Sequence, residues 1–260
     1  MQYEITGSGT PLVLVPGGLS GWLSWEPHAK ILSENYKVVR VQLLNVQCGL
    51  ENRELPPAYS VQTESDALCE TLNGLQLSAP ADIVGWSYGA FVAMQYALDY
   101  PERIRTLTLI EPPALWLLRT SGKFDEASQR EADFFLTVNG DITEDMLDHF
   151  LQHAGFTEEG KSARELPQWE KWIPFRQSLR NCPAAVNFED DKQRLRNFAK
   201  PTLLVKGTGS AAWLHNIIDE LSRNLPNSRI VEFPGAHAPH LASREFFLNE
   251  LSKFLRDGGM

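Results

Sequence analysis

The sequence contains few cysteines and no long apolar run. Its three cysteines, Cys48, Cys69 and Cys182, are far apart and form no C-x-x-C pair. We therefore expect free thiols in a reducing compartment rather than a disulfide framework. The longest apolar runs, such as PLVLV, are much shorter than the roughly 20 residues that a membrane-spanning helix needs. With no basic amphipathic stretch either, the sequence predicts no membrane association.

The sequence is also poor in positive charge. It has 24 Lys and Arg against 33 Asp and Glu, a formal net charge of −9. A phosphate backbone would repel such a chain, so we expect no nucleic-acid partner. The opening MQYEITGSGT lacks the basic region and apolar core of a secretory signal, which favours a cytoplasmic location. We expect a monomer or homodimer that acts on a small molecule.

Short apolar runs rich in β-branched residues recur along the chain and alternate with stretches of helical periodicity. This alternation is typical of an α/β fold in which helices wrap a mostly parallel sheet. Helices are expected at 26–35, at 60–75, directly after Ser87 and at 243–255. The runs that we predict as strands are 11–15, 38–44, 81–84, 104–110, 202–205 and 229–233.

The alternation stops after Leu109 and resumes only at Pro201. Between these points, residues 112–199 read as mostly helical segments separated by glycine and proline. The sequence therefore predicts a helical cap at 112–199, inserted before the last two strands of a core formed by 1–111 and 200–260.

The pentapeptide Gly85-Trp86-Ser87-Tyr88-Gly89 follows an expected strand and precedes an apolar helix. A serine on such a sharp turn is held at the carboxyl end of the sheet in a strained backbone conformation. The flanking glycines let neighbouring segments approach closely. We interpret Ser87 as a nucleophile.

Three segments together resemble the α/β-hydrolase superfamily, in particular small cap-bearing serine carboxylesterases. GWSYGA resembles the nucleophile turn of that family, LVLVPGGLSGWLSWEP its first oxyanion loop, and PGAHAPHLAS its histidine loop. The resemblance extends over nearly the whole chain apart from the insertion. It implies a hydrolase that needs no cofactor, although this fold carries many chemistries.

The resemblance places the general base in the loop after the last strand, where His237 is the first candidate and His240 its competitor. The two histidines form an H-x-x-H pattern, but a third ligand cannot be placed, so we expect no metal site. His149 and His153 would share one helical face and are interpreted as surface residues.

The acid departs from the usual pattern of the family. Most members have an Asp shortly after the strand that here reads TLLVKG, where this chain has Thr208 to Ala212 and no carboxylate. Glu111 instead ends the strand IRTLTLI, a position that some members use, and it keeps the chain order serine, acid, histidine. We expect Glu111 to orient His237. A Ser–His dyad, with Glu111 purely structural, is the alternative.

The remaining site residues follow from the same resemblance. The backbone amides of Gly18 and Tyr88 are the expected oxyanion donors, with Pro16 fixing the loop before them. Aromatic residues of the insertion, including Phe134, Phe135 and Phe175, suggest an apolar pocket or, alternatively, the packing of the cap on the core. The residues expected to bind substrate are Leu19, Trp86, Trp116, Trp169 and Trp172.

These features predict a serine hydrolase that cleaves an ester or related acyl bond of a small, largely apolar molecule through an acyl-enzyme. C–C hydrolases, lactonases and perhydrolases share the same residues and stay open as alternatives. A ligand-binding receptor or degenerate hydrolase is the alternative from another class, supported by the missing acid after TLLVKG.

Overall fold

The computed structural model describes residues 1–77, 80–157 and 160–258 and contains a single mostly parallel sheet of seven strands. Their order is β1-β3-β2-β4-β5-β6-β7, and only β1 runs antiparallel, against β3. The prediction of an α/β fold with a mostly parallel sheet is confirmed. The strands are β1 Tyr3–Thr6, β2 Thr10–Val15, β3 Tyr36–Val41, β4 Ala81–Trp86, β5 Ile104–Ile110, β6 Thr202–Gly207 and β7 Ser228–Phe233.

The structure corrects the predicted strands at two places. Strand β1 was not expected, because YEIT is mostly exposed at the edge of the sheet and carries no apolar run. The run expected at 38–44 is a strand only to Val41, and Leu44 begins a short helix, α2 (Leu44–Leu50). The carboxylate of Glu64 accepts hydrogen bonds from the backbone N–H groups of Leu44 and Asn45, both at 2.9 Å. Because Glu64 lies 19 to 20 residues further along the chain, no local sequence pattern marks the start of this helix.

Helices cover both faces of the sheet, and the period-two alternation of the strands explains the two layers. In β2, Leu12 and Leu14 face one layer, and Val13 and Val15 face the other. The first layer holds 3-10 helix η1 (Gly21–Trp25), α1 (Glu26–Leu32), α12 (Pro239–Ala242) and α13 (Arg244–Arg256). The second layer holds α3 (Val61–Gly74), α4 (Tyr88–Asp99), which leads into η2 (Pro101–Arg103), and α11 (Ala212–Asn224).

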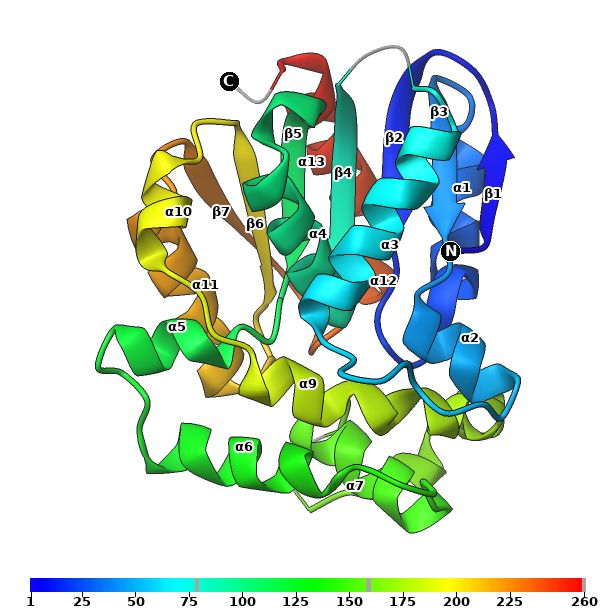
Figure 1. Cartoon of the computed structure of the whole chain (residues 1–260), viewed down its shortest axis with the longest axis vertical. Coiled ribbons are helices and arrows are strands. Elements are labelled where there is room, and N and C mark those ends of the chain that lie inside the picture. Colours follow the sequence, from blue (N-terminus) through cyan, green and yellow to red (C-terminus); the bar gives the residue numbers. More distant parts are fainter. Residues whose placement is uncertain (78–79, 158–159, 259–260) are drawn as a thin grey trace.

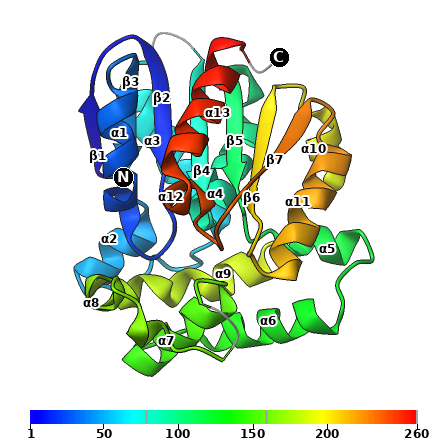
Figure 2. The same cartoon turned by 180° about the vertical axis from the view of Figure 1, so that it is seen from behind.

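Of the helices between β5 and β6, all but the last lie across the carboxyl ends of the strands, and the last lies beside α11 at the edge of the sheet (Figures 1 and 2). This is the segment in which we expected a cap, and the division of the chain into core and cap stays a prediction. The helices are α5 Leu115–Thr120, α6 Glu126–Thr137, α7 Glu144–His153, η3 Ala163–Glu165, α8 Trp169–Trp172, η4 Ile173–Asn181, α9 Cys182–Asn187 and α10 Lys192–Asn197.

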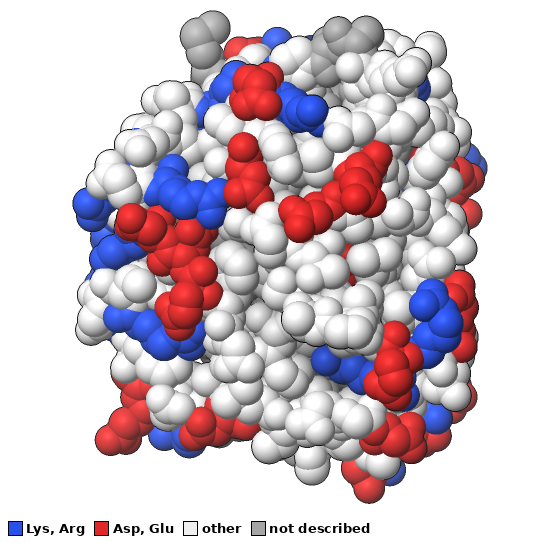
Figure 3. Space-filling model, in the orientation of Figure 1, with Lys and Arg blue, Asp and Glu red and all other residues white. Residues whose placement is uncertain are grey.

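The surface carries both signs of charge. On the face seen in Figure 3, acidic and basic side chains lie next to one another rather than in separate regions. Within the ranges that the structure describes, no helix has the length and apolar character needed to cross a membrane.

Two histidines are buried in the first helical layer. The Nε2 of His28 lies 3.0 Å from the backbone oxygen of His240, so it donates to that oxygen, and both side chains are fully buried beside Trp25. Burial lowers the pKa of His28 to about 4 and that of His240 well below 6.5. Both rings are therefore neutral in the folded protein at pH 7.

Acid should destabilise the fold through His28. Between pH 6.5 and about 4 the unfolded chain binds a proton at this residue and the folded chain does not, so the free energy of unfolding falls as the pH falls. The difference in pKa corresponds to about 3 kcal/mol. The free energy of unfolding can be measured by denaturant titration at pH 7.5 and at pH 4. Between these two pH values, His28→Leu should lose about 3 kcal/mol less of its unfolding free energy than the parent. His149→Leu, at an exposed position, is the control and should lose as much unfolding free energy as the parent. An equal loss in His28→Leu and His149→Leu would contradict the lowered pKa of His28.

Candidate active site

Ser87 occupies a strained turn between β4 and α4. Its φ of 54° and ψ of −126° place a non-glycine residue in the left-handed half of the backbone map. The glycines on either side are required by close contacts. A Cβ on Gly85 would lie 2.5 Å from Ala90 Cα, and one on Gly89 would lie 2.0 Å from the Pro16 carbonyl oxygen.

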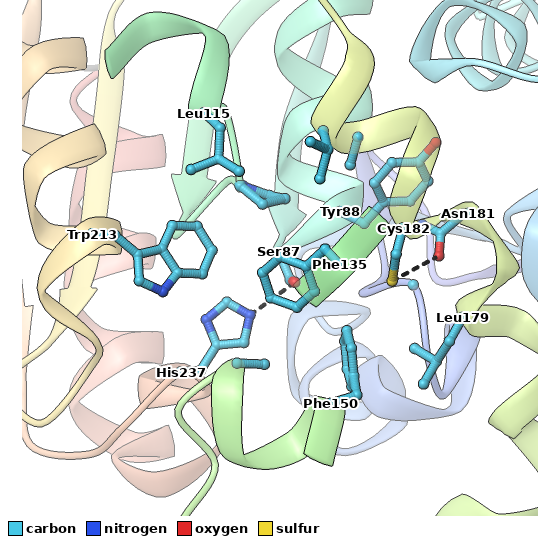
Figure 4. Close-up of a pocket in the computed structure, with 15 residues that line it drawn as sticks. Ser87, Tyr88, Leu115, Phe135, Phe150, Leu179, Asn181, Cys182, Trp213 and His237 are labelled. Atoms are coloured by element: carbon cyan, nitrogen blue, oxygen red, sulfur yellow. Dashed lines mark hydrogen bonds between the residues drawn. The ribbon is translucent and has the colours of Figure 1, made fainter. Parts of the chain in front are cut away.

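The side chains of Ser87, His237 and Glu111 form one hydrogen-bonded line. His237 Nε2 lies 2.8 Å from Ser87 Oγ (Figure 4), and His237 Nδ1 lies 2.8 Å from Glu111 Oε2. An imidazole protonated at Nδ1 donates to the carboxylate and accepts from the hydroxyl. His237 is 4% exposed and Glu111 is 0% exposed, so little solvent competes for these hydrogen bonds.

Two backbone groups at the end of β6 hold Glu111 in place. The backbone N–H of Gly207 donates to Glu111 Oε1 at 2.7 Å, and the Glu111 N–H donates to the Val205 oxygen at 3.2 Å. Glu111 itself has a φ of 46°. The end of β6 thus supplies a backbone donor at the place where we found no carboxylate in the sequence.

The other candidate histidines lie elsewhere. His240 is fully buried and packs against the rings of Trp25 and Trp86, each with a centroid separation of 4.8 Å. His153 Nδ1 lies 2.9 Å from Glu131 Oε2, and its ring stacks on Phe134. Among the described residues, no group of three or more His, Cys, Asp or Glu side chains could hold a metal ion.

The two expected oxyanion donors lie side by side. Tyr88 is the first residue of α4, where a backbone N–H has no partner within the helix. A Cβ on Gly18 would lie 3.2 Å from Tyr88 Cβ, so the two backbone segments are in contact. Both residues line the same cavity as Ser87, and their role as oxyanion donors stays a prediction.

A mostly apolar cavity opens above Ser87 and His237 (Figure 4), with about 560 Å³ of empty space including the part open to solvent. Gly18, Tyr88 and one side-chain amide, Asn181, also line it. Its apolar wall consists of Pro113, Leu115, Phe135, Phe150, Ala154, Leu179, Cys182, Ala185, Val186 and Trp213.

The five side chains expected to bind substrate do not line this cavity. Leu19 and Trp116 are buried in the core, at 7% and 0% exposure. Trp169 is also buried, with the Arg164 guanidinium 5.5 Å from the centre of its ring. Trp172 packs on Phe156, with ring centroids 5.6 Å apart. The three tryptophans of the insertion therefore pack its helices on one another and on the core, which was the alternative interpretation of the aromatic residues.

Trp86, the fifth of these residues, supports the histidine loop instead. Its indole N–H donates to the backbone oxygen of His237 at 2.8 Å, and it is 5% exposed. Its ring lies 6.0 Å from the imidazole, centre to centre. The residue before the serine therefore fixes the backbone of the histidine with which the serine pairs.

Comparison with known proteins identifies the family. A model described as "Alpha/beta hydrolase family" matches residues 12–250. The chain belongs to the alpha/beta hydrolase family. As a member of that family it is a hydrolase, and its mostly parallel sheet wrapped by helices is the sheet of this fold.

Several relatives cover nearly the whole chain. A pimeloyl-[acyl-carrier protein] methyl ester esterase of Nitrosomonas europaea is 25% identical and aligns with 96% of this hydrolase and 97% of its own length. A RutD protein of Azorhizobium caulinodans, named provisionally as a carbamate hydrolase, is 25% identical over 96% of this chain and 92% of its own. The structure of a thermophilic esterase from Thermogutta terrifontis superposes with a TM-score of 0.77, at 21% identity, over 100% of this chain and 94% of that one.

Sequence reasoning missed most of the wall of the cavity. Leu115 and Trp213 follow the ends of β5 and β6, and the rule that ligands of α/β sheets bind at the carboxyl ends of the strands could have indicated both. Of the other aromatic residues proposed for the pocket, only Phe135 lines it. Phe150 and Asn181 come from helices whose placement depends on tertiary packing, and no motif marks them.

The close contact at Gly89 predicts that a larger residue there would destabilise the fold. In Gly89→Ala the added methyl would collide with the Pro16 carbonyl oxygen, a backbone atom that cannot turn aside. We expect a loss of about 1–3 kcal/mol in the free energy of unfolding, measured by denaturant titration. Gly74→Ala is the matched control, because nothing lies within 4 Å of its added methyl and alanine favours a helix by up to about 1 kcal/mol. Equal stability of the two variants would contradict the contact.

Proposed function

We propose that this hydrolase is a serine esterase that cleaves carboxylic esters of small, largely apolar molecules through an acyl-enzyme. The observation that carries the proposal is the hydrogen-bonded line from Ser87 through His237 to Glu111, at the floor of a mostly apolar cavity. The methyl ester esterase that aligns with nearly the whole chain supports the same reaction class.

In the first half of the reaction, Ser87 Oγ attacks the carbonyl carbon of the ester while His237 Nε2 takes its proton. Glu111 holds the imidazole with its proton on Nδ1 and stabilises the imidazolium that forms. The Tyr88 and Gly18 amides donate to the oxyanion, each worth about 2.7–4 kcal/mol in the transition state. The imidazolium then protonates the leaving alcohol, and the acyl group stays on Ser87.

In the second half, His237 takes a proton from water as the water oxygen attacks the acyl-enzyme. The same amides receive the second oxyanion. The bond to Ser87 Oγ then breaks, the serine regains its proton from His237, and the carboxylic acid leaves. Every proton passes through His237 Nε2, which lies 2.8 Å from Ser87 Oγ.

The receptor alternative loses its main support. It rested on the missing carboxylate after TLLVKG, and Glu111 Oε2 lies within hydrogen-bonding distance of His237 in its place.

Labelling with a fluorophosphonate tests the nucleophile. We expect the folded parent protein to be labelled covalently at Ser87 and to hydrolyse p-nitrophenyl esters of short acyl chains, because the cavity is apolar and small. Ser87→Ala should abolish both reactions. An unlabelled but folded parent would refute the serine mechanism and favour the receptor. Turnover of lactones, C–C substrates or peracids well above that of esters would place the enzyme in one of the other reaction classes.

Changing Glu111 to Gln tests the acid. A glutamine amide donates a hydrogen bond to Nδ1 and so selects the imidazole tautomer that cannot accept the serine proton. We expect kcat to fall by about a thousandfold to ten-thousandfold, with little change in unfolding free energy. The exposed Glu189, changed to Gln, is the control. If Glu111→Gln kept the parental activity, Glu111 would have no catalytic role, and the site would be a Ser–His dyad.

A further inference from the structure

One buried carboxylate has no part in the mechanism above. Glu64 lies in the first turn of α3 and is 0% exposed. Its two oxygens accept hydrogen bonds from the Leu44 and Asn45 N–H groups and, at 2.6 Å, from the Tyr59 hydroxyl. Burial raises the pKa of Glu64, and these three hydrogen bonds act against the rise. Because a carboxylate is costly to bury even when it is hydrogen-bonded, stability alone is a poor explanation for its presence.

Glu64 holds the first turn of α2. The N–H groups at the start of a helix have no partner within that helix, and the Glu64 carboxylate accepts from two of them. Asn45 is the second residue of α2 and is 0% exposed. Its backbone is therefore anchored, and its side chain extends from a fixed point.

The side chain of Asn45 joins two backbone segments of the cavity. Its Nδ2 donates to the Gly18 oxygen at 2.8 Å and to the Ser178 oxygen at 2.9 Å. Both partners are carbonyl oxygens, which only accept, so the amide must face them with its N–H groups. Gly18 lines the cavity, and Ser178 lies in η4, which also contributes Leu179 to the cavity wall. One amide thus holds the loop after β2 and the wall beside it.

The oxygen of the same amide is unpaired. Among the described residues, Asn45 Oδ1 has no hydrogen-bond partner. A buried acceptor without a donor costs free energy, and a leucine of nearly the same shape would avoid that cost. The amide is therefore explained by the two carbonyl groups that it holds rather than by its packing.

The same carboxylate also reaches the second proposed oxyanion donor. Tyr88 Oη donates to Tyr59 Oη at 3.0 Å, and Tyr59 Oη donates to Glu64 Oε1. Tyr88 is 3% exposed, so this link is buried as well. Glu64 is connected to Tyr88 through one side chain and to Gly18 through another.

We propose that Asn45 and Glu64 are positioning residues, which fix the Gly18 segment beside Tyr88 so that both backbone amides meet the oxyanion. This inference rests on the proposed esterase function. Glycine has no side chain to anchor it and an unusually free backbone, and Asn45 restrains that backbone by holding the Gly18 carbonyl. Because the oxyanion forms only as the reaction proceeds, a misplaced donor lowers kcat more than it changes KM.

A trifluoromethyl ketone tests the positioning. Ser87 Oγ adds to its carbonyl carbon, His237 takes the serine proton, and the ketone oxygen becomes an oxyanion that cannot expel a leaving group. Trifluoromethyl butyl ketone and p-nitrophenyl pentanoate carry the same acyl chain. In Asn45→Leu we expect kcat to fall, and the inhibition constant of the ketone to rise, by the same factor of about ten to a hundred, with KM within about twofold of the parent.

Further variants test each member of the chain. Asn45→Ser should give the same result, because its hydroxyl is too short to reach both carbonyls, and it serves if Asn45→Leu does not fold. Glu64→Gln should act in the same direction, because a glutamine amide has a single acceptor oxygen for the three donors around it. Glu64→Asp keeps the charge but is too short to reach the α2 amides, and it serves if Glu64→Gln does not fold.

Asn224→Leu is the matched control. Asn224 is also buried, at 6% exposure, and its Nδ2 donates to the Glu220 backbone oxygen at 2.8 Å. It does not line the cavity. We expect this variant to lose stability but to keep the parental kcat, KM and inhibition constant. An equal fall of kcat in Asn224→Leu and Asn45→Leu would show general destabilisation and overturn the positioning role.

The outcomes separate the two proposals. If the folded Asn45 variants keep the parental kcat and inhibition constant, or change KM alone, the role of Asn45 is overturned and the esterase stands. Parental values in a folded Glu64 variant would overturn the role of Glu64. A folded parent that hydrolyses no ester, takes no fluorophosphonate label and is not inhibited by the ketone would overturn the esterase, and the positioning with it.

Discussion

The reversal of the chain at Ser87 is the constraint on which the site depends. Ser87, the residue directly after β4, has a positive φ. The next residue begins α4, and this first turn of the helix packs against the loop that follows β2. This contact fixes three elements at once: the serine, the first amide of the helix, and the glycine loop beside it. The proposed mechanism, in which the hydroxyl and the two amides meet at one carbonyl group, therefore depends on the close approach at Gly85 and Gly89.

Strain at this edge of the sheet is shared between adjacent strands. Ser87 and Glu111 both have positive φ, at a cost of about 1–3 kcal/mol each. Backbone hydrogen bonds continue the sheet past the regular strands, from the Ser87 N–H to the Ile110 oxygen and from the Glu111 N–H to the Val205 oxygen. Strands β4, β5 and β6 therefore hold both residues rigidly, and the histidine is the member of the line that comes from a longer loop.

The features of the fold and of the site that depend on local sequence pattern could be predicted from the sequence, and those that depend on tertiary packing could not. Strand periodicity and the turn around Ser87 indicated the sheet and the nucleophile, and the resemblance to the α/β-hydrolase superfamily indicated His237 and Glu111. The wall of the cavity could not be predicted in the same way, because Phe150 and Trp172 are both aromatic residues of inserted helices and only packing places one inside the cavity and the other against Phe156.

The hydrogen bond from the Gly207 amide to Glu111 has a consequence for how this enzyme can diversify. Because the last residue of β6 contributes its main-chain N–H to Glu111, and the residues at 208–212 contribute no carboxylate to the proposed triad, these residues are free of the chemical requirement that an aspartate there would impose. They lead directly into Trp213, which borders the cavity. Natural or designed substitutions in this segment can therefore change the substrate preference while Ser87, His237 and Glu111 keep their places.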